Sequence, residues 1–155
     1  MSSKSGQNKP YSNVKIQPPF LALLNIALTF VLTWLIPLPW VVPPILRGSG
    51  FLLVLLGFLL GLGALITFRR VRKTQQRAQL ITSGIYRFTR NPVYLGFLLM
   101  QTGLALNSGS YWGLFLAPVM VLLFNQLVIE QEEAILKQKF GDEYRNYQSK
   151  VRRWI

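Results

Sequence analysis

Four apolar runs divide this chain, and polar or charged stretches separate them. The runs cover residues 20–36, 50–68, 92–107 and 111–129. A membrane-spanning helix needs about 20 predominantly apolar residues, so each run predicts a span, although the third is short for a bilayer core about 30 Å thick. The pattern therefore predicts an all-α polytopic membrane protein with about four transmembrane helices.

The polar stretches predict how these helices are connected. The short polar stretch 107–110 joins the end of the third run to the fourth, which predicts a tight C-terminal helical hairpin. Beyond it, the cytoplasmic tail 130–155 is predicted to be helical to Phe140, to stop at Gly141 and to restart with Asp142 as N-cap. The restarted helix is predicted to be amphipathic and to lie on the membrane or over the mouth of a site, with four apolar or aromatic residues on one side: Tyr144, Tyr147, Val151 and Trp154.

The first nineteen residues differ from the rest. They are polar, carry three lysines and contain three prolines, which oppose a helix. We therefore predict a disordered basic arm over residues 1–19 and a single membrane domain over residues 20–155.

Composition narrows the class of function. The chain has 155 residues, of which 51% are hydrophobic and 14% charged, and a net charge of +12. Its cations flank apolar runs instead of decorating a soluble scaffold, so anionic lipid head groups are favoured as partners and nucleic acid is not. Cysteine and histidine are absent, which excludes disulfides, thiolate nucleophiles and the commonest metal and general-base chemistry.

Lysine and arginine counts predict the orientation. The arm has three, the first loop one, the second loop seven, the third none and the tail six. Cytoplasmic segments carry the excess of such residues, so both termini and the second loop are predicted to be cytoplasmic. The tail also holds all five acidic residues of the chain, which therefore face the same compartment as the seven-cation loop: Glu130, Glu132, Glu133, Asp142 and Glu143.

The glutamate pair admits two interpretations. Glu132 and Glu133 follow the last apolar run directly, where carboxylates are costly unless they pair, bind a ligand or point into water. They could form a solvated first turn that pairs with Lys137. Alternatively, they could belong to a site shared with the basic loop.

The loop and tail together resemble a known enzyme superfamily. Residues 82–96 read TSGIYRFTRNPVYLG, and after the helical hairpin come EEAIL at 132–136 and FGDEY at 140–144, followed by Tyr147 and Val151. This order and spacing resemble the isoprenylcysteine carboxyl methyltransferase and phospholipid methyltransferase superfamily. The resemblance covers residues 78–151.

The resemblance implies an integral membrane methyltransferase that binds S-adenosylmethionine on the cytoplasmic side and acts on a lipophilic substrate. Arg90 would orient the acceptor or the carboxylate of the donor, and Glu133 would support Glu132 or polarise the acceptor. The implied cofactor-binding residues are Ala78, Gln79, Leu80, Ile81, Tyr86, Asn91, Pro92, Val93, Tyr94 and Glu132.

Two positions depart from the pattern of the superfamily. Asn91 replaces a usual histidine and can form hydrogen bonds but cannot titrate near neutrality. Val128 stands where the prenylcysteine branch carries an arginine that meets the substrate, which leaves the acceptor open among an amine-bearing phospholipid, a prenylated acid and another isoprenoid.

A membrane reductase with a nicotinamide cofactor and a non-enzymatic lipid-binding protein are the alternative functions.

Overall fold

The computed structural model describes residues 17–74 and 79–155, with all regular elements there helical. The predicted arm lies outside the described residues except for its end, where α1 already begins at Pro18. A proline at the first helical position needs no backbone N–H partner, which explains this earlier start. The helices are α1 Pro18–Leu35, α2 Pro44–Thr74, η1 Gly84–Arg87, α3 Pro92–Ser108, α4 Tyr111–Phe124, η2 Asn125–Ile129, α5 Glu130–Phe140 and α6 Asp142–Lys150.

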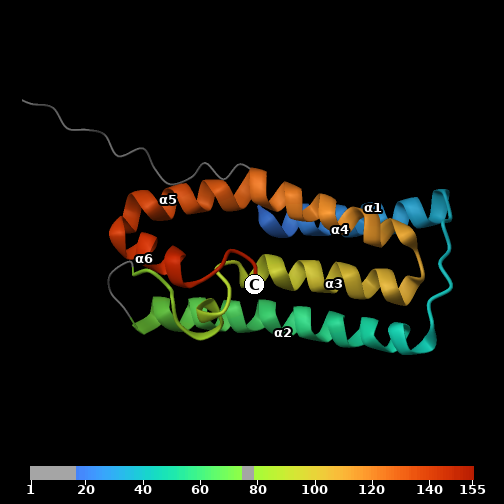
Figure 1. Ribbon diagram of the computed structural model, residues 1–155, viewed down its shortest axis with the longest axis horizontal. Coiled ribbons are helices and arrows are strands. Elements are labelled where there is room, and N and C mark those ends of the chain that lie inside the picture. Colours follow the sequence, from blue (N-terminus) through green and yellow to red (C-terminus); the bar gives the residue numbers. More distant parts are fainter. Residues whose placement is uncertain (1–16, 75–78) are drawn as a thin grey trace, which may run out of the picture.

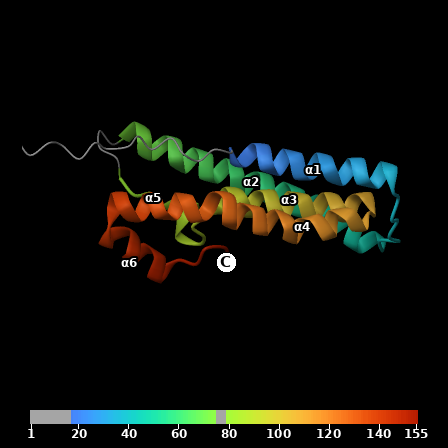
Figure 2. The ribbon, with the colours of Figure 1, turned by 90° about the horizontal axis from the view of Figure 1, so that it is seen from above.

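The long helices form an elongated bundle (Figures 1 and 2). α3 packs between α2 and α4, and α1 packs mainly on α4. η2 and α5 continue α4 in nearly the same direction beyond the end of the bundle, and α6 folds back beside α5. The basic loop and the acidic tail therefore meet at one end.

Three of the described helical segments are long and apolar enough to cross a membrane: Pro18–Leu35, Pro44–Val71 and Tyr111–Phe140. Exposed large apolar side chains cover much of α1 and α2, as expected for helices that face lipid. The 17-residue α3 is about 26 Å long at 1.5 Å per residue. The protein is thus an all-helical membrane protein, and the fourth crossing remains a prediction.

Glycines allow α2 and α3 to approach closely. A Cβ on Gly57 would lie 2.5 Å from the carbonyl oxygen of Gly96, and a Cβ on Gly103 would lie 2.5 Å from that of Gly50. Small residues at such crossings let two backbones come into van der Waals contact within a membrane. This contact holds α3, whose first turn carries Tyr94, against α2.

Polar side chains join the other helices. Gln101, which is buried, donates to Thr29 Oγ1 on α1 over 2.7 Å, and Asn25 Nδ2 donates to the carbonyl of Leu116 on α4 over 3.3 Å. At the end of the bundle away from the tail, the backbone N–H of Trp40, between α1 and α2, donates to the carbonyl of Gly109. Asn25 and Thr29 thus take part in helix packing.

The tail differs from the prediction in two details. Gly141 has φ +51° and separates α5 from α6 as expected, but it is itself the N-cap, and Asp142 is the first residue of α6. α6 ends at Lys150, so Trp154 lies beyond the helix. Tyr144 and Tyr147 are buried on the inner face of α6, which packs the helix over the end of the bundle.

Candidate functional site

A cavity of about 610 Å³ lies at the end of the bundle, between α5, α6, the second loop and the start of α3. Its volume is within the roughly 300–1,000 Å³ typical of small-molecule sites. The lining residues are Pro18, Pro19, Phe68, Gln79, Leu80, Ile81, Tyr86, Arg90, Asn91, Pro92, Val93, Tyr94, Glu132, Glu133, Ile135, Leu136, Lys139, Phe140, Tyr144 and Tyr147.

The structure brings the predicted site residues together. All of those that it describes line this one cavity, whether they come from the loop, the start of α3 or α5. Ala78 lies outside the described residues. Their individual roles in binding or catalysis remain predictions, but their common location is a finding.

Glu132 faces the start of α3. The Tyr94 hydroxyl lies 2.9 Å from both Oε1 and Oε2 of Glu132 and donates to this carboxylate. Tyr94 itself is buried and packs on Phe124, with ring centroids 4.9 Å apart. This packing fixes the phenol, which in turn orients Glu132 in the cavity wall.

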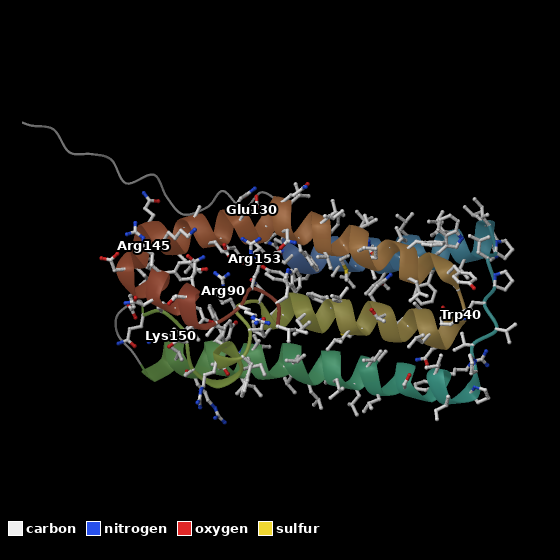
Figure 3. All side chains as sticks on the ribbon, viewed as in Figure 1. Trp40, Arg90, Glu130, Arg145, Lys150 and Arg153 are labelled. Atoms are coloured by element: carbon white, nitrogen blue, oxygen red, sulfur yellow. The ribbon has the colours of Figure 1, made fainter. Side chains whose placement is uncertain are left out.

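Glu133 has different partners. Arg153 donates from Nε to Oε1 over 3.1 Å and from Nη2 to Oε2 over 2.8 Å, and Gln148 Nε2 lies 3.4 Å from Oε2. Arg90 Nη1 lies 3.1 Å from Oε1. We call Glu133, Arg90 and Arg153 the Glu133 cluster; Figure 3 shows its two arginines between α5 and the loop.

The two glutamates are therefore not equivalent. Neighbouring residues on a helix point about 100° apart, so Glu132 meets Tyr94 while Glu133 meets two guanidinium groups. Among the described residues that line the cavity, Glu132 is the carboxylate outside the Glu133 cluster. It is the anionic group best placed to meet a cationic or hydroxyl-bearing ligand.

Phenols complete the wall. Burial, and next the charge of Glu132, raise the pKa of Tyr86. Burial is also the largest cause that raises the pKa of Tyr147 to about 12. Both phenols are thus neutral at physiological pH, and the Tyr147 hydroxyl donates to the Tyr86 carbonyl over 2.6 Å, tying α6 to η1.

Several residues that line or support the cavity were not predicted from the sequence. Ile135, Leu136 and Lys139 follow Glu132 by three, four and seven positions, a spacing that puts them on its helical face and could have identified them. Arg153 gave no such signal, because it lies in an irregular segment and meets Glu133 only through the tertiary fold. Val128 lies in the buried core beside Phe124.

Comparison with known protein families shows to which family the chain belongs. The sequence model of the phospholipid methyltransferase family matches residues 45–143, which include α2, the loop, the hairpin and the start of α6. The chain belongs to this family. The matched region contains the lining residues from the second loop, the start of α3 and α5, and it supports a membrane methyltransferase over a nicotinamide-dependent reductase or a non-enzymatic lipid-binding protein.

Three enzymes are among the curated relatives of this chain. A protein-S-isoprenylcysteine O-methyltransferase of Schizosaccharomyces pombe is 36% identical over 72 residues, 46% of this chain and 30% of the relative. Protein-S-isoprenylcysteine O-methyltransferase B of Arabidopsis thaliana is 31% identical over 113 residues, 68% of this chain and 57% of the relative. Methanethiol S-methyltransferase 1 of Bradyrhizobium diazoefficiens is 30% identical over 86 residues, 56% of this chain and 29% of the relative.

The matched part of the chain thus spans between 29% and 57% of the length of these three relatives. Their names include both oxygen and sulfur as methylated atoms, so likeness to them does not by itself fix the acceptor. No solved structure matches the chain.

Tyr94→Phe tests the contact that orients Glu132. The variant keeps the ring that packs on Phe124 and removes only the hydroxyl that donates to Glu132. A hydrogen bond to a charged group contributes about 1.5–3 kcal/mol, so we expect the free energy of unfolding to fall by up to about that amount. Because Glu132 is then no longer held in place, we also expect the affinity for S-adenosylmethionine to fall by up to about 100-fold. Calorimetric titration of the purified protein measures the affinity. An unchanged affinity would mean that the Tyr94–Glu132 contact does not shape the site.

Proposed function

We propose that this protein is an S-adenosylmethionine-dependent methyltransferase that methylates a lipophilic acceptor at the membrane. The observation that carries the proposal is the single cavity that gathers every described residue of the predicted cofactor and catalytic set. The family to which the chain belongs supports the same class of reaction.

The chemistry of the wall fits this cofactor. S-adenosylmethionine is a sulfonium cation with an amino acid group and a ribose, and it supplies the methyl group when bound. Glu132 can accept hydrogen bonds from hydroxyl or ammonium groups, and the aromatic ring of Tyr86 in the cavity lining can contact a cation or a flat base. Arg90 Nε is buried and has no hydrogen-bond acceptor among the described residues, so this N–H group is available to donate to a ligand carboxylate.

The residues need only align the reactants and exclude water. Methyl transfer from a bound S-adenosylmethionine would be a displacement, in which a lone pair of the acceptor would bond to the methyl carbon and the electrons of the carbon–sulfur bond would leave on sulfur. This displacement requires no covalent enzyme intermediate, which agrees with a chain that has no cysteine or histidine. Alignment alone can contribute about 7–11 kcal/mol in the best intramolecular cases.

The surroundings favour a lipophilic acceptor. Pro18 and Pro19 of α1 and Phe68 of α2 border the cavity with apolar surface where these helices face the bilayer. An amine-bearing phospholipid, a prenylated acid and another isoprenoid all present a polar group on an apolar chain. Each could reach the cavity from the membrane.

Labelling identifies the acceptor. Membranes from cells with and without the protein are incubated with methyl-labelled S-adenosylmethionine, and their lipid extracts are analysed by mass spectrometry. We expect a labelled lipid that depends on the protein and disappears in the Tyr94→Phe and Glu132→Ala variants. Retention of a reduced nicotinamide cofactor by the purified protein, with no binding of S-adenosylmethionine, would contradict the proposal.

We also propose that the cavity faces the cytoplasm, as the distribution of lysine and arginine indicates. The absence of cysteine permits a direct test with single-cysteine variants. Ser149 is exposed on α6, at the cavity end of the bundle. Gly48 lies at the opposite end of the bundle, near the start of α2, where a Cβ would meet no atom within 4 Å. Each is replaced by cysteine in a separate variant. In intact cells, an impermeant maleimide should label the Gly48→Cys protein and spare the Ser149→Cys protein; the reverse pattern would invert the orientation.

A further inference from the structure

The chain beyond α6 does not point into solvent. Residues 151–154 run back from α6 along the second loop and bring the end of the chain beside the start of α3 (Figure 1). We call residues 151–154 the strap. The strap has no regular secondary structure, so contacts with other segments must hold it in place.

Backbone carbonyls of the strap accept hydrogen bonds from the loop. Arg90 N–H donates to the carbonyl of Arg152 over 3.1 Å. The carbonyl of Arg153 accepts from Asn91 Nδ2 over 3.0 Å and from Thr89 Oγ1 over 3.2 Å. Thr89 and Asn91 are both buried, so these bonds are shielded from competing water.

Side chains of the strap connect it to the helices. Arg153 forms the two-point contact with Glu133 on α5 that completes the Glu133 cluster. This contact raises the pKa of Arg153, mainly through its hydrogen bonds to Glu133. Trp154 packs against the buried core that includes Tyr94. Three segments far apart in sequence thus meet at Glu133: the loop through Arg90, α5 itself and the strap.

We propose that Arg153 and Glu133 are positioning residues for methyl transfer, and that the strap holds the loop and Tyr94 in register with Glu132. This inference rests on the function proposed above. It assigns Glu133 to the support of the site, because its carboxylate is engaged by Arg90 and Arg153. In this proposal the side-chain amide of Asn91 binds the strap and not the cofactor, so Asn91 contributes to the cavity wall through its backbone.

Arg153→Ala tests the inference, with the neighbouring Arg152→Ala as matched control. The Arg152 side chain is exposed, and the strap uses only its backbone carbonyl. Arg153 donates two hydrogen bonds to the Glu133 carboxylate, and a hydrogen bond to a charged group is worth roughly a factor of 10 to 100, so we expect Arg153→Ala to release the strap and to weaken S-adenosylmethionine binding by up to about 100-fold. The turnover number at saturating cofactor should fall much less. Arg153→Lys should restore part of the affinity, since lysine keeps the charge but not the two-point geometry.

Trp154 reports the position of the strap independently of the cofactor. The other three tryptophans, Trp34, Trp40 and Trp112, lie at the far end of the bundle, where Figure 3 labels Trp40. After incorporation of 5-fluorotryptophan, Trp154→Phe assigns the Trp154 fluorine resonance. This resonance should shift towards its solvent-exposed position in Arg153→Ala and, to a smaller extent, in Thr89→Val, and stay unchanged in Arg152→Ala.

The two measurements separate the possible failures. If Arg153→Ala loses cofactor affinity while the Trp154 resonance stays in place, Arg153 meets the cofactor directly and the strap is not the cause. If Arg153→Ala changes neither quantity relative to Arg152→Ala, the inference is wrong. If the unmodified protein binds no S-adenosylmethionine, the proposed function falls, while the fluorine spectra still decide whether Arg153 holds the strap.

Discussion

Glu132→Ala is expected to weaken S-adenosylmethionine binding by about 2–3 kcal/mol, roughly 30- to 150-fold, and to abolish detectable methyl transfer. The Glu132 carboxylate accepts from Tyr94 and lies outside the Glu133 cluster, so its loss leaves the cavity without the anionic group that we assign to the cofactor. Titration calorimetry in detergent measures the affinity, and transfer of a labelled methyl group to membrane lipids measures the reaction.

Two companion variants sharpen this prediction. Glu132→Gln keeps the shape of the side chain and removes its charge, so an equal loss in both variants would assign the effect to charge. Glu130→Ala removes the same charge from an exposed position on the same helix and should bind as the unmodified protein does. If Glu132→Ala binds S-adenosylmethionine normally, Glu132 is not part of the cofactor site.

Gly57→Ala is expected to destabilise the bundle by about 1–3 kcal/mol, the usual cost of overpacking. The new Cβ would lie 2.5 Å from the carbonyl oxygen of Gly96, a backbone atom that can give way only if α2 and α3 separate. Separation would also move the first turn of α3, which carries Tyr94. We therefore expect a lower melting temperature and a weaker cofactor affinity in the same variant.

Gly61→Ala provides the matched control, one turn further along α2. A Cβ there meets no atom within 4 Å, and alanine is the better helix former, so stability should be equal or higher. Thermal unfolding in detergent, followed by circular dichroism, compares the two variants. Equal melting temperatures would show that the close approach of α2 and α3 does not limit stability.

The pattern of apolar and polar residues was sufficient to predict most of the helices. The predicted spans 20–36 and 92–107 lie within two residues of α1 and α3 at each end, because a long apolar run and its flanking prolines define a helix locally. α2 extends the predicted span 50–68 in both directions, since its polar ends continue the helix outside the apolar run. Gly141 likewise marks the break between α5 and α6 through its own backbone preference.

The interruption of α4 was not predictable in the same way. Residues 125–129 form a π-helical turn, closed by Glu130 N–H donating to the carbonyl of Asn125, and they contain no proline or glycine that would signal it. One extra residue in a turn rotates everything that follows. The direction in which Glu132 and Glu133 point therefore depends on a feature that packing decides.

The sequence by itself determined that this is a helical membrane protein and that its acidic tail and its basic second loop lie at one end, and it predicted which loop and tail residues line a common cavity. These properties follow from local periodicity, charge counts and short motifs. Only the tertiary structure decided that Tyr94 engages Glu132 while Arg90 and Arg153 share Glu133, and that the strap closes back on the loop. Adjacent glutamates on a helix look alike in sequence, and what distinguishes them is the partner that distant segments bring to each.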